Sequence, residues 1–177
     1  MGSEINHRVN CGWMNWSRLS AVLCDRKISG NMKGRLYKRV VRPALMYGAE
    51  TWAITKAQER KLEVAEMRML RWMCGLTRRD RVRNERIRET VKVGPLGKKV
   101  QESRLRWFGH VERRDESYVG KKVDKLNIGG KRKVGRPKLR WRDKVEEDLR
   151  EKGWKRREAL HRGLWRGRIR EGNADPK

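Results

Sequence analysis

The stretch from Thr55 to Gly75 constrains the fold most, because it carries a complete set of helix signals. Thr55 can cap the first turn, and Gln58, three residues later, can serve as its capping-box partner. Gly75 supplies the left-handed residue that commonly ends a helix. One face carries apolar side chains at helical spacing: Leu62, Ala65, Met69, Trp72 and Met73. We therefore predict a helix whose apolar face, with Trp72 buried, packs on a core.

The opposite side of this predicted helix is basic. It carries Arg60, Lys61, Arg68 and Arg71. The chain then passes directly into a connector that holds Arg78, Arg79, Arg81 and Arg83. An apolar face for packing, with arginines around it, indicates a scaffold helix that presents positive charge to a polyanion.

The rest of the chain allows only a thin core. Charged residues make up 40% of the sequence, against about 25% in an ordinary globular domain. Leu, Ile, Val and Phe supply roughly one-fifth, which is close to the composition of disordered chains. Eight tryptophans favour folding, since each buries a large area. The fold class we predict is mainly α, a small helical bundle with a flexible basic linker and a basic helical C-terminal segment.

Helical periodicity recurs on both sides of the central stretch. The predicted helices span residues 4–24, 32–40, 84–90, 96–111, 139–151 and 155–169. Pro43 forbids an uninterrupted helix at the end of the second of these. The most apolar run, residues 40–52, is expected to be buried, and its second half fits either a helical turn or a short strand. Residues 112–138 lose the periodicity and read as a flexible basic linker rich in glycine.

The charge indicates the class of partner. A formal net charge of +26 favours nucleic acid, because lysine and arginine neutralise phosphates and release condensed counterions. An anionic membrane surface fits less well, since basic residues occur in every segment and no apolar run approaches the ~18 residues of a membrane span. We therefore expect RNA and/or DNA as partner, and no membrane. The three unpaired cysteines fit a reducing compartment, so we expect an intracellular protein, nuclear if it follows DNA.

No set of residues points to catalysis. Polymerases and nucleases hold divalent metals with paired carboxylates, and the chain has no Asp-Asp pair. Its densest acids, Glu146, Glu147 and Asp148, follow one another on a predicted helix and are expected to pair with basic residues along its surface. The histidines lie far apart, with no cysteine at zinc-ligand spacing. We expect no cofactor, no metal and no small-molecule substrate.

A basic segment near the C-terminus is the second candidate binding site. It holds Lys131, Arg132, Lys133, Arg136, Lys138 and Arg140. The segment is similar to an AT-hook, in which an extended Arg-Gly-Arg-Pro core enters the minor groove of A·T-rich DNA. Val134 replaces the first arginine of that core, which leaves a generic phosphate-binding linker or a solvated tail as alternatives. Trp16, Trp72, Trp107 and Trp141 could stack on bases, but each lies in an apolar stripe and is expected in the core.

Four segments in order resemble a known family. They are residues 41–52 (VRPALMYGAETW), 65–75 (AEMRMLRWMCG), 104–111 (RLRWFGHV), and Gly135-Arg136-Pro137 followed by Trp141. Together they resemble the region after the polymerase palm in LINE-type (non-LTR) retrotransposon reverse transcriptases. The resemblance implies a thumb-like helical region over residues 1–113, a basic Gly-rich linker over 114–138 and a basic helical segment over 139–177, which grip an RNA template and a DNA primer.

The family activity that the resemblance implies is RNA-directed DNA polymerisation. Its aromatic-Ala-Asp-Asp metal motif has no counterpart in this sequence, so the chain resembles a non-catalytic C-terminal fragment. A palm domain on an upstream or separate polypeptide is then a candidate partner. Two alternatives stay open: part of an active reverse transcriptase whose palm lies upstream, and an inert pseudogene product.

Overall fold

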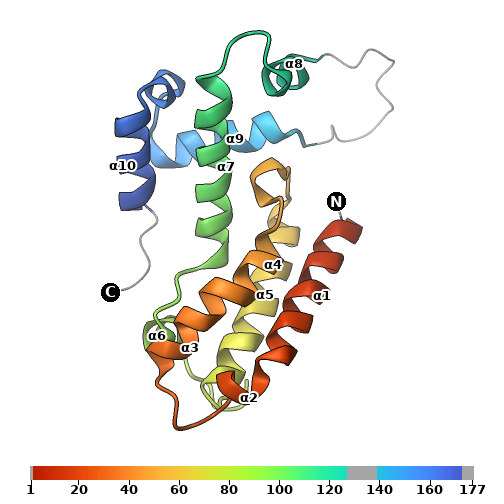
Figure 1. Cartoon of the computed structure of the whole chain (residues 1–177), viewed down its shortest axis with the longest axis vertical. Helices are drawn as coiled ribbons and strands as arrows, with labels where there is room; N and C mark the ends of the chain where they lie inside the picture. Colours follow the sequence, from red (N-terminus) through yellow and green to blue (C-terminus); the bar gives the residue numbers. More distant parts are fainter. Residues whose placement is uncertain (1, 127–138, 173–177) are drawn as a thin grey trace.

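The computed structural model describes residues 2–126 and 139–172, which form helices and turns without a strand (Figure 1). The mainly α fold class is thereby confirmed. The elements are α1 (Gly2–Arg18), α2 (Ser20–Leu23), α3 (Gly30–Leu36), the π-helix η1 (Tyr37–Val41), α4 (Arg42–Met46), the 3-10 helix η2 (Ala49–Thr51), α5 (Lys56–Met73), α6 (Asn84–Val91), α7 (Leu96–Glu112), α8 (Val119–Lys125), α9 (Trp141–Lys152), the 3-10 helix η3 (Arg156–Leu160) and α10 (Arg162–Gly172).

The molecule has two halves joined by α7 (Figure 1). In one half α1 packs on α4 and α5, and α6 packs on α3 and α5. In the other half α9, η3 and α10 pack on α7, and α8 contacts α7 near its C-terminal end. Helix α7 also contacts α5 and η2, so it connects the early and late segments of the chain.

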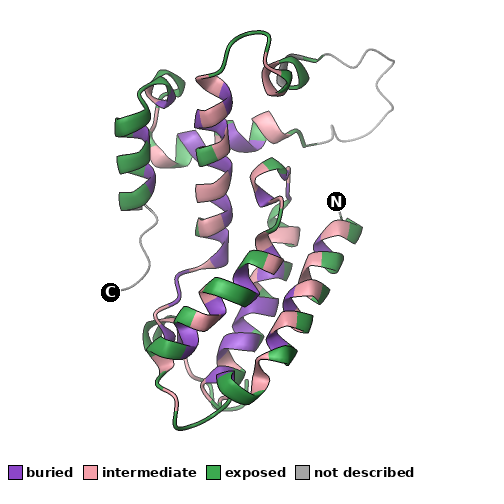
Figure 2. Cartoon of the chain, in the orientation of Figure 1, coloured by how far each residue is buried: buried purple, intermediate pink, exposed green. Residues whose placement is uncertain are grey.

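In the described residues the buried apolar side chains form three clusters, and Figure 2 colours the buried positions along the helices purple. The first lies among α1, η1, α4, α5 and α6 and includes Leu45, Met69 and Leu70. The second, between η2, α5 and α7, includes Trp52 and Leu62. The third attaches α9 and α10 to α7 through Leu105, Phe108, Val145, Leu149, Ala159, Trp165 and Ile169. The predicted thin core is therefore divided along the length of the molecule.

The central helix α5 begins and ends as its sequence predicts. Gln58 N donates to Thr55 Oγ1 at 3.3 Å, and Thr55 N donates to Gln58 Oε1 at 2.9 Å, which completes the capping box. Gly75 adopts the left-handed conformation with φ 67° directly after the helix. Leu62, Met69 and the other members of the predicted stripe are buried, with one exception.

Trp72 is that exception, and the prediction of its burial is wrong. The side chain is 51% exposed. Its ring packs on Trp13 and Trp16 of α1, at centroid distances of 5.3 and 5.4 Å. Position 72 lies at the edge of the apolar stripe, where α1 covers one side of the indole and leaves the other to solvent. Trp16 is buried as expected, and Trp107 and Trp141 are half-buried.

The chain remains helical through Pro43, although the α-helix itself is interrupted. Proline lacks the N–H that an α-helix needs at this point. The backbone widens into the π-helix η1, in which Arg42 N donates to Tyr37 O, and resumes as α4 with Pro43 in its first turn. The second half of the apolar run is helical rather than extended, as η2 shows.

The expectation that residues 40–52 are buried holds for one face only. Val41, Leu45 and Trp52 are buried, whereas Val40 is 38% and Tyr47 69% exposed. The reason is the helical conformation, which turns some side chains of any continuous apolar run toward solvent.

Most later helices also match their predicted ranges, namely α6, α7 and α9. The linker prediction missed α8, which spans Val119–Lys125 within the segment expected to lack periodicity. The last predicted helix is divided, because His161 takes an extended conformation between η3 and α10.

The acids of α9 are not all surface partners, which corrects a second expectation. Lys144 Nζ does bond Glu147 at 2.8 Å along the helix. Asp148, however, is buried and accepts from Arg104 Nε at 2.5 Å and Nη2 at 3.1 Å, both from α7. Trp141 Nε1 also donates to Glu50 O at 2.8 Å. These contacts fix α9 across α7 and against η2, a long-range packing that helical periodicity does not reveal.

Candidate nucleic-acid interface

The basic connector between α5 and α6 has a defined backbone. Asp80 accepts from Thr77 N at 2.5 Å and from Thr77 Oγ1 at 2.8 Å. Both hydrogen bonds lower the pKa of the Asp80 carboxyl, and the bond from the backbone N–H of Thr77 has the larger effect. Arg81 adopts a left-handed conformation with φ 51°, and Arg71 Nη2 donates to Val82 O at 3.0 Å. The turn therefore holds its basic side chains on a fixed loop at the end of α5.

The four predicted arginines of this connector all lie at the surface. Arg78, Arg79, Arg81 and Arg83 are exposed. Within residues 2–126 and 139–172, no carboxylate forms an ion pair with any of the four. Their charges are thus available to a phosphate backbone.

A hollow of about 510 Å³ lies between α5, the connector and α6, and we call it the α5–α6 hollow. Its basic lining residues are Arg60, Arg68, Arg71, Arg78 and Arg88. Glu63 and Glu85 are its carboxylates, so positive charge predominates. Arg60, Arg68 and Arg78 are exposed and reach it from two different elements.

Arg88 is held at the wall of this hollow by a buried carboxylate, Glu66 of α5. Glu66 has no exposed surface and accepts from Arg42 Nη2 at 2.9 Å and Arg88 Nη1 at 2.8 Å. Tyr37 Oη donates to it at 3.1 Å, and Leu96 N does so at the same distance. Burial, and then the charge of Glu66, raise the pKa of Tyr37 well above its ordinary value. The cluster joins η1, α4, α5, α6 and α7 into one support for the basic surface.

The segments that resemble the retrotransposon family thus supply buried structural charges. Arg42, Glu66 and Arg104 come from three of those segments, and each is at most 5% exposed. No role was predicted for any of the three from the sequence. Their signal would have been a charged residue at an apolar position: Arg42 interrupts an apolar run, and Glu66 and Arg104 fall at the helical spacing of apolar stripes. Charged residues at such positions are rarely buried unless they are paired.

Of the second predicted site the structure describes Arg140, and this residue does not lie beside the connector. Arg140 is exposed beside the start of α9, at the opposite half of the molecule from the connector (Figure 1). Its backbone N donates to Asp143 Oδ2 at 2.8 Å, which caps α9. Lys131, Arg132, Lys133, Arg136 and Lys138, with the segment similar to an AT-hook, lie outside the described residues.

The structure contains a second basic hollow that was not predicted from the sequence. Packing of α10 on α7 forms a hollow of about 510 Å³, which we call the α7–α10 hollow. Its arginines are Arg106, Arg113, Arg162, Arg166 and Arg170. The last three recur every fourth residue, and that spacing was available in the sequence. Their approach to α7 was not, because it depends on the third core cluster.

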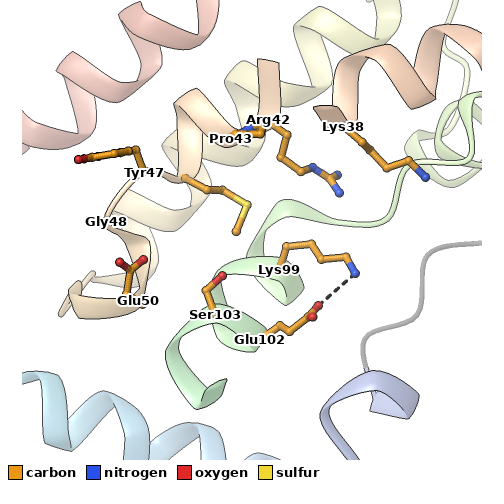
Figure 3. Close-up of a pocket in the computed structure, with 10 residues that line it drawn as sticks. Lys38, Arg42, Pro43, Tyr47, Gly48, Glu50, Lys99, Glu102 and Ser103 are labelled. Carbon is orange, nitrogen blue, oxygen red and sulfur yellow. Dashed lines mark hydrogen bonds and ion pairs between the residues drawn. The ribbon is translucent and has the colours of Figure 1, made fainter. Parts of the chain in front are cut away.

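A third hollow, of about 620 Å³, contains cations that are already engaged (Figure 3). Lys38 Nζ donates to Lys92 O at 3.0 Å, and Lys99 pairs with Glu102 at 3.1 Å. Arg42 also lines it but is bound to Glu66 and to Gly94 O. This hollow is a weaker anion site than the two others, since a ligand has to compete with these bonds.

Two further properties bear on the chemistry. In the described part of the chain, no group of three or more His, Cys, Asp or Glu side chains is arranged to hold a metal ion. No helix there combines the length and apolar character that crossing a membrane requires.

Comparison with known proteins finds similarity to a transposon-derived protein. The chain is 30% identical over 155 residues to a transposon-derived protein of Caenorhabditis elegans. The match covers 82% of this chain and 54% of that protein, so the chain spans about half the length of its relative. No protein-family model and no solved structure matches the chain. The similarity supports a transposon origin.

Proposed function

We propose that this chain is a non-catalytic, nucleic-acid-binding part of a polypeptide derived from a LINE-type retrotransposon polymerase. It grips a template–primer through contacts between arginines and phosphates. A palm domain on an upstream or separate polypeptide is its partner in this proposal. The transposon-derived relative and the four sequence segments support the origin, and the basic surface supports the binding.

The observation that carries the proposal is the row of exposed arginines on the α5–α6 connector, beside the α5–α6 hollow. Arg78 contributes to both. The backbone around these arginines is anchored: Arg71 Nη2 bonds Val82 O within the connector, and Glu66 holds Arg88 of the following helix. Preorganised arginines that lack carboxylate partners bind phosphates without breaking existing ion pairs.

The test is an equilibrium binding series by fluorescence anisotropy with an RNA–DNA template–primer. The variant Arg78→Gln/Arg79→Gln/Arg81→Gln removes three connector charges. The matched control, Arg35→Gln/Arg39→Gln/Arg157→Gln, removes three exposed arginines that line neither basic hollow. We expect the connector variant to lose about tenfold or more in affinity relative to the control.

Heparin competition separates a template–primer grip from general binding of polyanions. We expect the template–primer to be retained at heparin concentrations that displace an unrelated single strand. Equal affinity of the connector variant and the control, or equal displacement of both nucleic acids, would contradict the proposal.

A further inference from the structure

The α7–α10 hollow has a rigid base. Trp165 of α10 is 1% exposed, and its Nε1 donates to Leu105 O at 3.0 Å. Its ring packs against Phe108 and Trp154, at centroid distances of 6.1 and 5.4 Å. Gly109 of α7 permits this contact, because a Cβ at that position would meet the Trp165 indole. The two walls of the hollow are thus held at a fixed separation by one buried tryptophan.

The α10 wall presents three arginines in one row. Arg162, Arg166 and Arg170 follow at intervals of four residues, are exposed, and line the hollow. Eight residues of helix extend ~12 Å, which is the length of roughly three to four nucleotides of one strand. No ion pair to any of the three occurs within the described ranges.

The α7 wall opposes this row with more positive charge. Arg113 Nη1 donates to Ala159 O at 2.6 Å, which fixes the guanidinium at the C-terminal end of α7. Burial lowers the pKa of Arg113, and the charge of Arg162 lowers it further, so like charges face each other across the hollow. Among the residues that line it, Glu102 is the carboxylate, and it already bonds Lys99 and Arg106.

We propose that the α7–α10 hollow is a second phosphate-binding site, which takes the backbone of a nucleic-acid strand along the row of Arg162, Arg166 and Arg170. The inference rests on the proposed function and adds a grip at the other half of the molecule. A phosphate between the two walls relieves the repulsion among the arginines and gains charge-assisted hydrogen bonds from both helices. The resemblance to retrotransposon polymerases did not point to these residues.

The test compares Arg162→Gln/Arg166→Gln/Arg170→Gln with Arg35→Gln/Arg39→Gln/Arg157→Gln across a salt series. Both variants lose three positive charges, so a difference between them reports position rather than net charge. We expect the α10 variant to bind the template–primer at least about tenfold more weakly than the control. We also expect the negative slope of log affinity against log salt to become shallower, by about one unit for each phosphate that the variant no longer neutralises.

Unfolding curves of both variants establish that α10 stays folded, and the single variant Arg166→Gln is the substitute if the triple variant melts early. Equal affinities and slopes for the α10 variant and the control would overturn the second site. A loss of affinity for heparin with unchanged affinity for the template–primer would also overturn the second site, because it indicates a general anion site. If wild-type protein binds the template–primer and only the connector variant weakens it, the proposed function stands and this site falls. Absence of any wild-type binding refutes both.

Discussion

Glu66 connects the helices in the half of the molecule that contains α1 to α6. Four groups donate hydrogen bonds to its fully buried carboxylate. Two of them are the arginines Arg42 and Arg88. Burying charges costs solvation energy, and the cost is offset only when all partners are present. The cluster therefore makes the helix arrangement specific, and its loss should be severe.

Replacement Glu66→Ala should lower the free energy of unfolding by about 3–5 kcal/mol, since it leaves the buried Arg42 and the partly buried Arg88 without their carboxylate. Urea denaturation followed by circular dichroism measures the loss. Glu85→Ala, an exposed glutamate of α6, is the control and should change stability by less than about 0.5 kcal/mol. A loss below about 1 kcal/mol for Glu66→Ala would show that the arginines find other partners.

We expect two separable roles for Trp72 at the surface of α5. Half of its side chain is exposed, and Arg68 lies one turn before it on the same helix. Exposed indoles next to arginines suit base stacking, which contributes ~1–3 kcal/mol per base. Its other half contacts Trp13 and Trp16, and aromatic pairs of this kind contribute ~0.5–1.5 kcal/mol.

We therefore expect Trp72→Ala to cost about 1–2 kcal/mol of stability and about tenfold in affinity for single-stranded nucleic acid. Trp165→Ala is the contrasting variant: its buried indole should cost about 3–5 kcal/mol. Thermal melts and anisotropy measure the two effects independently. Unchanged single-strand affinity for a folded Trp72→Ala protein would remove Trp72 from the binding surface.

At the scale of elements, close approach of backbones sets the position of α3 on α6. A Cβ at Gly34 would collide with the carbonyl oxygen of Val91, at the C-terminal end of α6. Gly167 of α10 is also helical, but nothing lies within 4 Å of the position its Cβ would take. The two glycines therefore provide the same substitution in a tight and in an open setting.

Gly34→Ala should destabilise the protein by about 1–3 kcal/mol, because a backbone carbonyl cannot move aside as a side chain can. Gly167→Ala should instead stabilise it by up to about 1 kcal/mol, since alanine favours helix and meets no clash. Denaturant midpoints of the two variants give the comparison. Shifts of the same sign in both would refute the close packing of α3 on α6.

The extent of the helices could be predicted from sequence because their signals are local. The capping box at Thr55, the left-handed Gly75 and the stripe around Met69 need only neighbouring residues. Trp72 could not be placed in this way, because its exposure depends on how far α1 extends over the end of α5. Helix α8 was missed because its seven residues contain few apolar anchors.

The candidate site likewise has a part that local sequence signals predict and a part that depends on long-range packing. The connector arginines were found from sequence because they follow a recognisable helix end. The α7–α10 hollow required knowledge of a pairing across more than fifty residues, such as the bond from Trp165 to Leu105. The buried pair of Arg104 and Asp148 was likewise hidden, because an acid on a charged helix normally faces solvent.

At the scale of the whole molecule, the chain is a helical support with basic hollows at both halves. Helix α7 connects the halves, and a buried carboxylate fixes it to each: Glu66 accepts a hydrogen bond from Leu96 N at its first residue, and Asp148 forms an ion pair with Arg104. The whole sequence carries a formal net charge of +26. The α5–α6 hollow lies in one half of this support and the α7–α10 hollow in the other.

The most direct test of the central claim is the affinity of the wild-type protein for a template–primer, measured over a series of salt concentrations. Each phosphate that the protein neutralises adds about −0.9 to the slope of log affinity against log salt on duplex DNA. Binding at both hollows and the connector predicts a straight line with a slope steeper than about −4. A line that is flat against salt, or the absence of measurable binding at low salt, would contradict the account.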